Sequence, residues 1–335
     1  MATHGVLPDA EIERAIREGW IAADTAFVTD QVQPASLDLR LGDVAYRLRA
    51  SFLPGAGQSV ASRLDGELVM HKIDLSQGAV LETGCVYLAP LLERVKLPAH
   101  LAGAANPKSS TGRIDVFTRL IADGASAFDA VPAGYEGPLW AEISPCTFSI
   151  LVRPGARLSQ LRLRRGQTHA QHSSDFTIDL SLKGPVGFRA KRHSGVIDVD
   201  RIGAYDPRDF WEPLEARRGR VVLEPGQFYI FASKENVLIP PNEAAEMAPI
   251  RPELGEFRAH YAGFFDPGFG VAPHEGRAVL EVRSRDVPFF VEDGQPVGKL
   301  VFEQLTGPAA KLYGETGSSY QGQGLKLSKH FAAWK

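Results

Sequence analysis

Apolar and polar residues alternate along many short segments of the chain. Residues 36–42 read Ser-Leu-Asp-Leu-Arg-Leu-Gly, so every second residue from Leu37 is leucine. This alternation predicts a β-strand with one buried and one polar face. Further strand-like segments occur at 44–48, 85–88, 139–143, 148–152 and 158–163. Because glycine and proline separate these segments throughout the chain, the pattern predicts a mainly β protein of short strands.

One segment near the N-terminus has a helical pattern instead. Asp9 is a suitable N-cap, Ile12 and Ile16 recur at helical spacing, and Gly19 ends the segment. The sequence therefore predicts a short leading helix, and we expect few other helices, all of them short.

The strand pattern begins again in the second half of the chain. Residues 37–41 (LDLRL) are matched by residues 178–182 (IDLSL). Five further matches follow in the same order: 44–47 with 186–189, 82–88 with 224–230, 97–98 with 239–240, 141–143 with 280–282, and 153–155 with 292–294. Six matches in one order predict an internal duplication.

The duplication predicts two domains, with the boundary in the polar stretch 166–174. We expect a first domain over residues 1–168, which includes the leading helix, and a second over residues 169–335. Each domain is expected to be a β-barrel or β-roll, because closing a sheet hides its edges.

The composition indicates which kinds of binding partner the net charge of the protein does not attract. The net charge is −3, with 44% hydrophobic and 23% charged residues, which is ordinary for a globular protein without bulk attraction to nucleic acid or anionic lipid. Cys85 and Cys146 are far apart and form no disulfide framework. With no long apolar run and no secretory signal, we expect a cytoplasmic protein that binds neither nucleic acid nor membrane.

A phosphate-binding corner is predicted at residues 106–113, Asn-Pro-Lys-Ser-Ser-Thr-Gly-Arg. Its candidate ligands are two cations and two hydroxyls: Lys108, Ser109, Ser110 and Arg113. Gly112 allows close approach of a ligand to the backbone. The alternative is an exposed polar turn.

The matching stretch of the second half does not keep this chemistry. Residues 250–256 retain one cation, lack both serines and have Glu256 where the corner has Arg113. Because an acid there repels phosphate, we expect only the first copy to bind a polyanion.

Two glutamates hold equivalent positions in the two copies. Glu142 and Glu281 each lie on a predicted strand between apolar neighbours. Each is either an outward-facing acid or a carboxylate in a pocket wall, whose pKa burial would raise so that it can exchange a proton near neutral pH.

Two glycine-containing segments are further candidates. Residues 263–270 contain Asp266-Pro-Gly between phenylalanines, which predicts a tight hairpin able to hold a nucleoside, and residues 128–135 repeat it loosely around Asp129. Residues 318–324 contain Tyr320 and Gln323 and are either a disordered tail or a lid over a ligand.

Known metal and nucleotide motifs are missing from the sequence. The nine histidines are scattered, Pro145-Cys146 lacks the second cysteine of a zinc deaminase, and no His-x-Glu is present. Neither a Walker loop nor a Rossmann glycine motif occurs. We therefore expect no zinc.

Together these segments resemble the trimeric dUTPase and dCTP deaminase superfamily, most closely the dCTP deaminases, in a tandem-duplicated form. The resemblance covers nearly all of residues 7–324. It is carried by the leading helix, residues 36–42, Lys108-Ser-Ser-Thr-Gly-Arg113, Asp266-Pro-Gly-Phe, Val279-Leu-Glu281, Gly307-Pro308 with Tyr313, and Ser319-Tyr320-Gln-Gly-Gln323.

The resemblance implies metal-free hydrolytic deamination of dCTP to dUTP and ammonia, which supplies dTTP precursors. It implies that Glu142 or Glu281 is the general base, with Arg113 beside the reacting centre. The substrate-binding residues that it implies are Lys108, Ser109 and Ser110 for a magnesium-bound triphosphate, Asp266 or Asp129 in the nucleoside hairpin, and Tyr313, Tyr320 and Gln323 in the closing tail.

Two departures from the family pattern concern the phosphates. Lys108 replaces the usual arginine, and Ser319 stands where the family tail carries a lysine, so one cation is missing. The active site is either composite, joining the corner of copy one to Glu281 and the tail of copy two, or complete within copy one around Glu142.

Other functions and assemblies stay open at this point. The alternatives to deamination are a dUTP pyrophosphatase, a bifunctional deaminase and pyrophosphatase, and a non-catalytic nucleotide-binding homologue. The family also implies feedback inhibition by dTTP and the possibility of a homo-oligomer.

Overall fold

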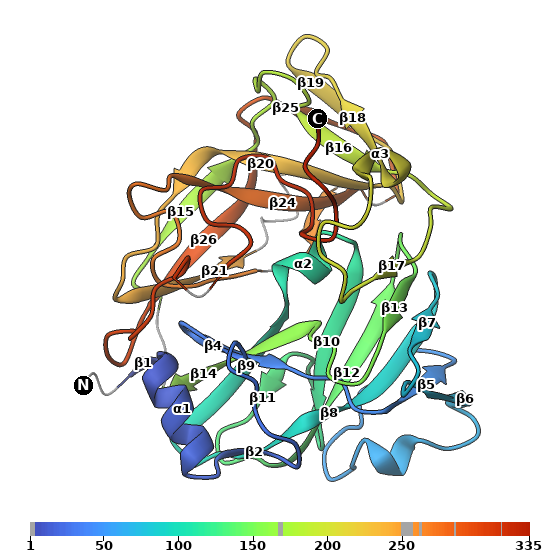
Figure 1. The fold of residues 1–335 in the computed structure, drawn as a ribbon, viewed down its shortest axis with the longest axis vertical. Helices are drawn as coiled ribbons and strands as arrows, with labels where there is room; N and C mark the ends of the chain where they lie inside the picture. Colours follow the sequence, from blue (N-terminus) through green and yellow to red (C-terminus); the bar gives the residue numbers. More distant parts are fainter. Residues whose placement is uncertain (1–3, 167–169, 249–256, 261–262, 285, 316) are drawn as a thin grey trace.

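The computed structural model describes residues 4–166, 170–248, 257–260, 263–284, 286–315 and 317–335 (Figure 1). Within these ranges the chain is mainly β, which confirms the fold class predicted from the alternation. The predicted domain boundary between residues 168 and 169 lies outside the described residues. We therefore speak of an N-terminal half up to Gly166 and a C-terminal half from Ala170.

The N-terminal half occupies the lower part of Figure 1. Its elements are β1 (Gly5–Val6), α1 (Asp9–Arg17), β2 (Ile21–Ala23), β3 (Val32–Gln33), β4 (Ser36–Leu39), β5 (Val44–Leu48), the 3-10 helix η1 (Ala61–Arg63), β6 (Val69–Asp74), β7 (Ala79–Leu81), β8 (Val86–Lys96), β9 (Leu101–Pro107), α2 (Ser109–Gly112), β10 (Val116–Ala122), β11 (Ala130–Val131), β12 (Glu136–Pro145), β13 (Ile150–Val152) and β14 (Ser159–Arg165).

The C-terminal half lies above it. Its elements are β15 (His172–Thr177), β16 (Gly187–Ala190), β17 (Ile197–Asp198), α3 (Pro207–Phe210), β18 (Trp211–Leu214), β19 (Arg220–Leu223), β20 (Phe228–Val237), β21 (Glu243–Ala248), β22 (Phe257–His260), β23 (Phe264–Phe265), β24 (Gly276–Ser284), β25 (Phe289–Glu292) and β26 (Pro296–Gln304).

Two antiparallel sheets form the body of the N-terminal half. One has the order β11-β9-β14-β4-β3 with β1 beside β14, and the other β10-β12-β8-β5-β6 with β2 beside β8. The C-terminal half has the sheets β15-β26-β21-β23, β18-β16-β20-β24-β22 and β19-β25. A further sheet joins the halves, because β17 pairs in parallel with β13 next to β7.

The long central strands pair in the same way in both halves. Glu142 on β12 lies opposite Leu88 on β8, and Glu281 on β24 lies opposite Ile230 on β20. Each glutamate therefore occupies the same place in an equivalent antiparallel pair.

Strand β24 is buried on both faces. Its residues Leu280 and Val282 point into the core of the C-terminal half, whereas Val279 packs into a cluster that continues into the N-terminal half. Side chains alternate between the two faces of a strand, so one β24 strand serves both cores. The other C-terminal residues in the shared cluster include Phe188, Phe228, Ile230 and Trp211.

Phe148 is a residue of the N-terminal half that belongs to this shared cluster. Its ring packs edge-on against Trp211 at 5.3 Å and Phe210 at 5.7 Å between centroids. Phe331, near the C-terminus, packs against the same rings. The two halves therefore share one hydrophobic core.

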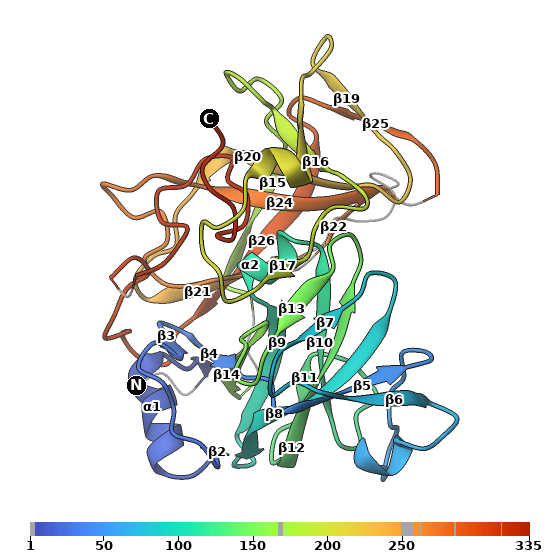
Figure 2. The ribbon, with the colours of Figure 1, turned by 45° about the vertical axis from the view of Figure 1, so that its right-hand side comes forward.

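The corresponding face of the N-terminal half is covered differently. Leu88, Ile121 and Trp140 form a separate cluster with residues of the loop between β5 and β6, including Phe52 and Val60. This loop, residues 49–68, carries η1 and lies far from the C-terminal half (Figure 2). Each half buries an equivalent strand face, one against the other half and one against its own loop.

The leading helix α1 spans Asp9–Arg17, close to the predicted segment. Asp9 is not its N-cap, because Pro8 holds that position. The Asp9 carboxylate instead accepts the backbone N–H groups of Ala310 (2.8 Å) and Lys311 (3.0 Å). None of the helices in the described ranges is long and apolar enough to cross a membrane.

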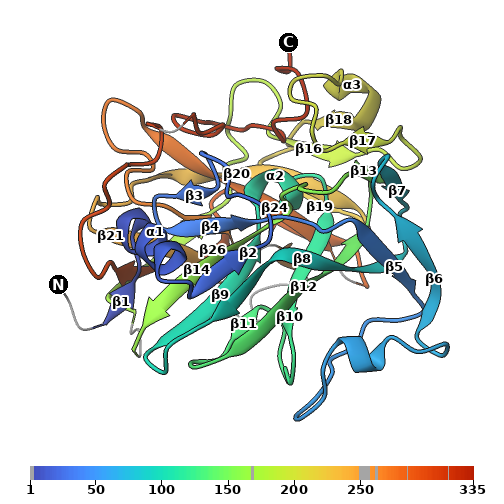
Figure 3. The ribbon, with the colours of Figure 1, turned by 60° about the horizontal axis from the view of Figure 1, so that its bottom comes forward.

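The described residues of the C-terminal segment after β26, 305–315 and 317–335, run back across the molecule (Figure 3). Asp9 holds its beginning, as described above. Its end is held by Phe331, which is buried among aromatic rings, and by a hydrogen bond from the Ala332 N–H to the Tyr205 carbonyl (2.9 Å). The segment is therefore tied down at both ends.

Replacing Phe148 with alanine tests the shared core. Loss of the fully buried ring removes contacts to both halves and leaves a cavity, so the free energy of unfolding should fall by about 3–5 kcal/mol in a urea titration. The control is Phe290→Ala, because Phe290 is 60% exposed, and its effect should stay within about 0.5 kcal/mol. Equal stability of the two variants would contradict a shared core.

Candidate active site

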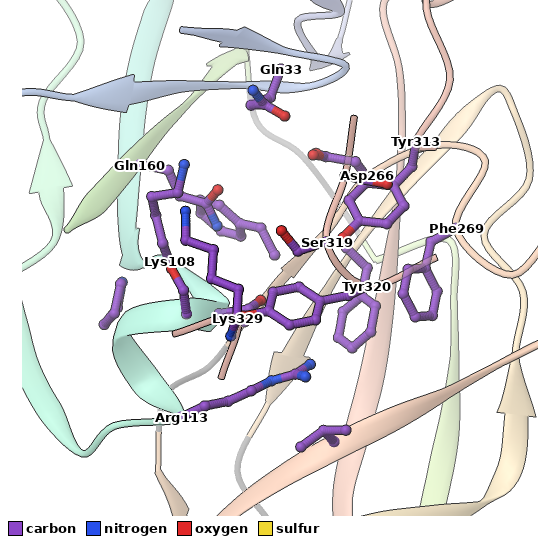
Figure 4. A pocket seen from close by; sticks show the side chains of 18 of the residues that line it. Gln33, Lys108, Arg113, Gln160, Asp266, Phe269, Tyr313, Ser319, Tyr320 and Lys329 are labelled. Carbon is purple, nitrogen blue, oxygen red and sulfur yellow. Dashed lines mark hydrogen bonds between the residues drawn. The ribbon is translucent and has the colours of Figure 1, made fainter. Parts of the chain in front are cut away.

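A pocket lies between the two halves, next to α2 (Figure 4). Its lining from the N-terminal half is mostly charged or polar and includes Asp30, Asp38, Lys108, Ser109, Ser110, Arg113, Arg157 and Gln160. Its lining from the C-terminal half includes Phe264, Phe265, Asp266, Phe269, Val279, Glu281, Tyr313, Ser319, Tyr320, Gln323 and Lys329. One side of the pocket therefore suits an anion, and the other combines rings with two acids.

The predicted phosphate corner forms one wall. Lys108 leaves β9 in an extended conformation, α2 makes one turn, and Arg113 follows it. Ser110 and Arg113 are buried. The cations of this wall contact carboxylates: Lys108 pairs with Asp38, and Arg157 lies 2.8 Å from Asp30.

Asp38 belongs to the alternating segment that predicted a half-buried strand. All four residues of β4 are buried. The Asp38 side chain lines the pocket, and the Ser36 hydroxyl donates to Gln160 Oε1 (3.4 Å), so the polar face of this strand does not meet solvent. The Asp38 Oδ1 atom accepts no hydrogen bond from any described residue.

Glu281 lies across the pocket on β24, and its side chain is buried. Burial raises the pKa of its carboxyl to about 8, although the charge of Arg113 acts in the opposite direction. The Arg113 Nε atom lies 3.9 Å from Glu281 Oε1, too far for a hydrogen bond. Burial outweighs the cation because the two groups do not touch directly.

Arg113 is held by the C-terminal segment. Its Nη1 donates to Gln323 Oε1 (2.9 Å) and to the Lys326 carbonyl (3.1 Å). The Tyr320 ring covers its guanidinium at 3.9 Å, a cation–π arrangement. Tyr320 and Gln323 thus form part of the pocket wall, where the sequence left open a disordered tail or a lid.

The Asp266 hairpin closes another side. Burial raises the pKa of Asp266 to about 6, against the opposing charge of Arg162, whose Nη2 lies 3.4 Å away. Gly268 has φ +90°, and a Cβ there would meet Leu312 Cβ at 2.7 Å, so glycine lets the C-terminal segment pass. The Tyr313 N–H bonds the Pro267 carbonyl (2.8 Å), which places the Tyr313 ring beside Phe269.

The described residues that line the pocket do not include Glu142 or Asp129. Glu142 is buried on β12 and forms an ion pair with Arg119 (2.6 Å) on the neighbouring strand. Asp129 accepts the Leu120 N–H (2.8 Å), and burial raises its pKa to about 7. The predicted counterpart of the corner, residues 250–256, lies outside the described residues.

Sequence reasoning missed several pocket residues. Arg157 and Gln160 follow the repeated Arg153-Pro-Gly segment, so the next residues of that match were the available signal. Lys329 comes from the C-terminal end and lies near Lys108 in Figure 4. Its pKa is lowered by burial and by the charges of Lys108 and Arg157. Lys329 thus adds a cation to the pocket lining, ten residues after Ser319.

Metal-binding side chains do not gather in the described part of the chain. No group of three or more histidine, cysteine, aspartate or glutamate side chains there is arranged to hold a metal ion.

Family models match the chain over nearly its whole length. The N-terminal domain model of 2′-deoxycytidine 5′-triphosphate deaminase matches residues 3–167, and the C-terminal domain model matches residues 156–331. The chain belongs to the 2′-deoxycytidine 5′-triphosphate deaminase family. It is therefore a dCTP deaminase, as the sequence motifs predicted.

Similar proteins include one of the same architecture. The crystal structure of 2′-deoxycytidine 5′-triphosphate deaminase from Agrobacterium tumefaciens is 50% identical, with a TM-score of 0.87 over 91% of this chain and 100% of that one. A dCTP deaminase of Halorubrum lacusprofundi is 29% identical over 47% of this chain and 75% of its own length. A dUMP-forming dCTP deaminase of Parafrankia sp. is 32% identical over 56% of this chain and 91% of its own length.

The raised pKa of Glu281 predicts a pH-dependent stability. A group whose pKa is raised by folding stabilises the protein fully below its unfolded value, 4.5, and this contribution is lost as the pH rises through about 8. Glu281→Gln mimics the protonated form. From pH 5 to 8 the variant should therefore gain stability relative to the wild type, by up to about 1.4 kcal/mol per pH unit.

Unfolding by urea at several pH values measures this difference. The matched control is Glu136→Gln, which removes a carboxylate from an exposed pair with Lys96. Parallel pH curves for the wild type and Glu281→Gln would show that Glu281 is not a group with a raised pKa.

Proposed function

We propose that this enzyme deaminates dCTP to dUTP and ammonia at one composite site between the two halves, with Glu281 as general base. The observation that carries the proposal is the pairing of a buried Glu281 from one half with Arg113 from the other. Both line a pocket that also contains the cationic corner. A site of this kind provides a proton acceptor and a triphosphate cradle on opposite walls.

The proposed chemistry requires a group that both takes and returns a proton. Glu281, as the carboxylate, takes a proton from the water that attacks C4 of cytosine; the C–O bond forms while the C4=N3 π bond opens and its electron pair moves to N3. The proton is then delivered to the exocyclic nitrogen, the C–N bond breaks, ammonia leaves with the electron pair of that bond, and the N3 pair re-forms the C4=N3 bond. A proton shift from the C4 hydroxyl to N3 completes the uracil base. A pKa of about 8 suits both steps near neutral pH. The positive Arg113 guanidinium beside Glu281 would stabilise negative charge that develops at the reacting centre.

The triphosphate is assigned to the corner. Lys108, Ser109 and Ser110 supply a cation and hydroxyl donors, and Lys329 adds a second cation from the C-terminal segment. Polyphosphate would compete with the Asp38 and Asp30 carboxylates that Lys108 and Arg157 contact. Such an exchange favours a ligand with several negative charges.

Magnesium carried by the triphosphate fits the same wall. The buried Asp38 Oδ1 has no hydrogen-bond partner in the described structure, and carboxylate oxygen is a ligand that Mg²⁺ prefers. The Asp38 carboxylate would coordinate the ion or accept a hydrogen bond from one of its water ligands. Bound magnesium would neutralise part of the triphosphate charge.

The nucleoside is assigned to the ring-lined side of the pocket. Asp266 and Phe269 belong to the hairpin, and Tyr313, Tyr320 and Gln323 belong to the C-terminal segment. Rings provide stacking surfaces for a base, and amide and carboxyl groups provide hydrogen bonds to polar edges.

We also propose that the chain arose by duplication and that the copy-one glutamate has lost this role. The curated relatives cover about half of this chain but most of their own length, as one ancestral unit would. Glu142 contacts Arg119 of its own sheet at hydrogen-bond distance, whereas Glu281 does not touch Arg113 directly. A base committed to an ion pair is less available to a water molecule.

A second product is possible because several relatives are named dUMP-forming dCTP deaminases. Such an enzyme would also break the bond between the α- and β-phosphates. Identifying the products of dCTP turnover separates the alternatives: ammonia with dUTP supports our proposal, and ammonia with dUMP and pyrophosphate supports the second.

The two glutamates are distinguished by separate substitutions. Glu281→Gln should lower kcat for ammonia release by about 1000-fold or more, because glutamine cannot take the proton. Glu142→Gln is the matched control, and its kcat should remain within about 10-fold of the wild type. If Glu142→Gln alone abolished turnover, the composite site would be wrong.

We expect Lys329 to contribute to binding of the triphosphate. Lys329→Met should raise KM for dCTP about 10-fold with little change in kcat, because one cation contact to a phosphate is lost in ground and transition states alike. Lys299→Met, at a half-exposed lysine on β26, is the control. An unchanged KM in Lys329→Met would remove Lys329 from the binding site.

A further inference from the structure

A second charged contact crosses between the halves two residues away from the first. Arg113 and Asp115 follow α2, and Glu281 and Arg283 lie two apart on β24, so they share one face of the strand. Arg113 approaches Glu281 at 3.9 Å, and Arg283 forms an ion pair with Asp115. The two contacts lie side by side with opposite polarity.

Each member of the second pair is held firmly by its own half. Asp115 is fully buried and has φ +56°, a left-handed conformation that aspartate and asparagine adopt more readily than most residues. Its Oδ2 also accepts the Thr147 hydroxyl. On the other side, Arg283 Nη1 donates to the Gly226 carbonyl (2.8 Å). Each member of the pair is therefore hydrogen-bonded within its own half as well as paired with the other half.

The distance between Arg113 and Glu281 is not fixed by a direct bond between these two side chains. No hydrogen bond joins them, and the Nη1 of Arg113 is bound to Gln323 and Lys326 of the C-terminal segment. The Arg113 Nε atom has no hydrogen-bond partner among the described residues. The separation of cation and carboxylate must therefore come from how the halves are fixed nearby.

We propose that Asp115 and Arg283 form a positioning pair, which sets the distance between Arg113 and Glu281 for catalysis. The proposal rests on the proposed function, which assigns Glu281 as the base. Arg283 and Asp115 are absent from the described residues that line the pocket, so the pair acts through its neighbours rather than by contact with substrate.

Breaking the pair should alter both rate and pH dependence. The charged group facing Glu281 across the pocket is Arg113. On the two neighbouring strands, the residues opposite Glu281 are the apolar Ile230 of β20 and the titratable His260 of β22. Its own face of β24 carries Val279 and Arg283. If Arg113 moves away, its charge no longer opposes the rise in the pKa of Glu281. Glu281 then stays protonated up to a higher pH. The acidic limb of the activity profile therefore shifts to higher pH.

The experiment compares Arg283→Gln, Arg283→Lys and Asp115→Asn with the wild type in the ammonia-release assay between pH 5 and 10. Arg283→Gln should lower kcat at least 10-fold, change KM for dCTP less than 3-fold and move the acidic limb upward. Arg283→Lys keeps the charge and should restore part of both effects. Asparagine also adopts a positive φ readily, so Asp115→Asn removes only the charge of Asp115. This variant should also lower kcat and shift the acidic limb to higher pH, even if Arg283→Gln does not fold.

The control is Arg189→Gln, which breaks an arginine–carboxylate pair with Glu212 inside the C-terminal half, outside the described pocket lining. Its kcat and pH profile should match the wild type. Wild-type kcat and pH profile in folded Arg283→Gln, or in Asp115→Asn, would overturn the positioning role, whatever the loss of thermal stability. Glu281→Gln in the same assay separates the two proposals, because an active Glu281→Gln contradicts the base assignment and not only the pair.

Discussion

The burial of one apolar strand face between the two halves is the constraint on which the site depends. Phe188, Phe228, Ile230 and Trp211 of the C-terminal half belong to the same hydrophobic cluster as Phe148, and Trp211 packs directly against the Phe148 ring. Hydrophobic burial is non-directional, so it holds the halves together without specifying their exact register. The register comes from directional contacts at the rim of this core, where β17 pairs with β13 and Arg283 pairs with Asp115.

Burial also gives the pocket its chemistry. The same packing that joins the halves removes Glu281 from water and raises its pKa, while Arg113 from the opposite half limits the rise. In the N-terminal half the equivalent strand face is covered by the loop of residues 49–68, and Glu142 pairs with Arg119 of its own sheet. The two equivalent carboxylates therefore have different surroundings: Glu281 lines the pocket near Arg113, whereas Glu142 pairs with Arg119.

The C-terminal segment connects these features. It follows β26, is held near its beginning by Asp9, passes Gly268, covers Arg113 with Tyr320 and places Phe331 in the shared core. Because both ends are anchored, its middle part can contribute Gln323 and Lys329 to the pocket at defined positions. The segment belongs to the wall of the site as much as the sheets do.

The sequence by itself determined the mainly β class, the leading helix, the corner at Lys108–Arg113 and the family, because alternation and local motifs depend on neighbouring residues. The family resemblance also implied two candidates for a general base, the glutamates at equivalent positions of the two copies. Only the tertiary structure separated Glu281 from Glu142, corrected the role of Asp9, and brought Arg157 and Lys329 to the pocket. Those outcomes depend on contacts between segments that lie far apart in the sequence. Alternation and local motifs describe only neighbouring residues, so they do not show which distant segments pack together.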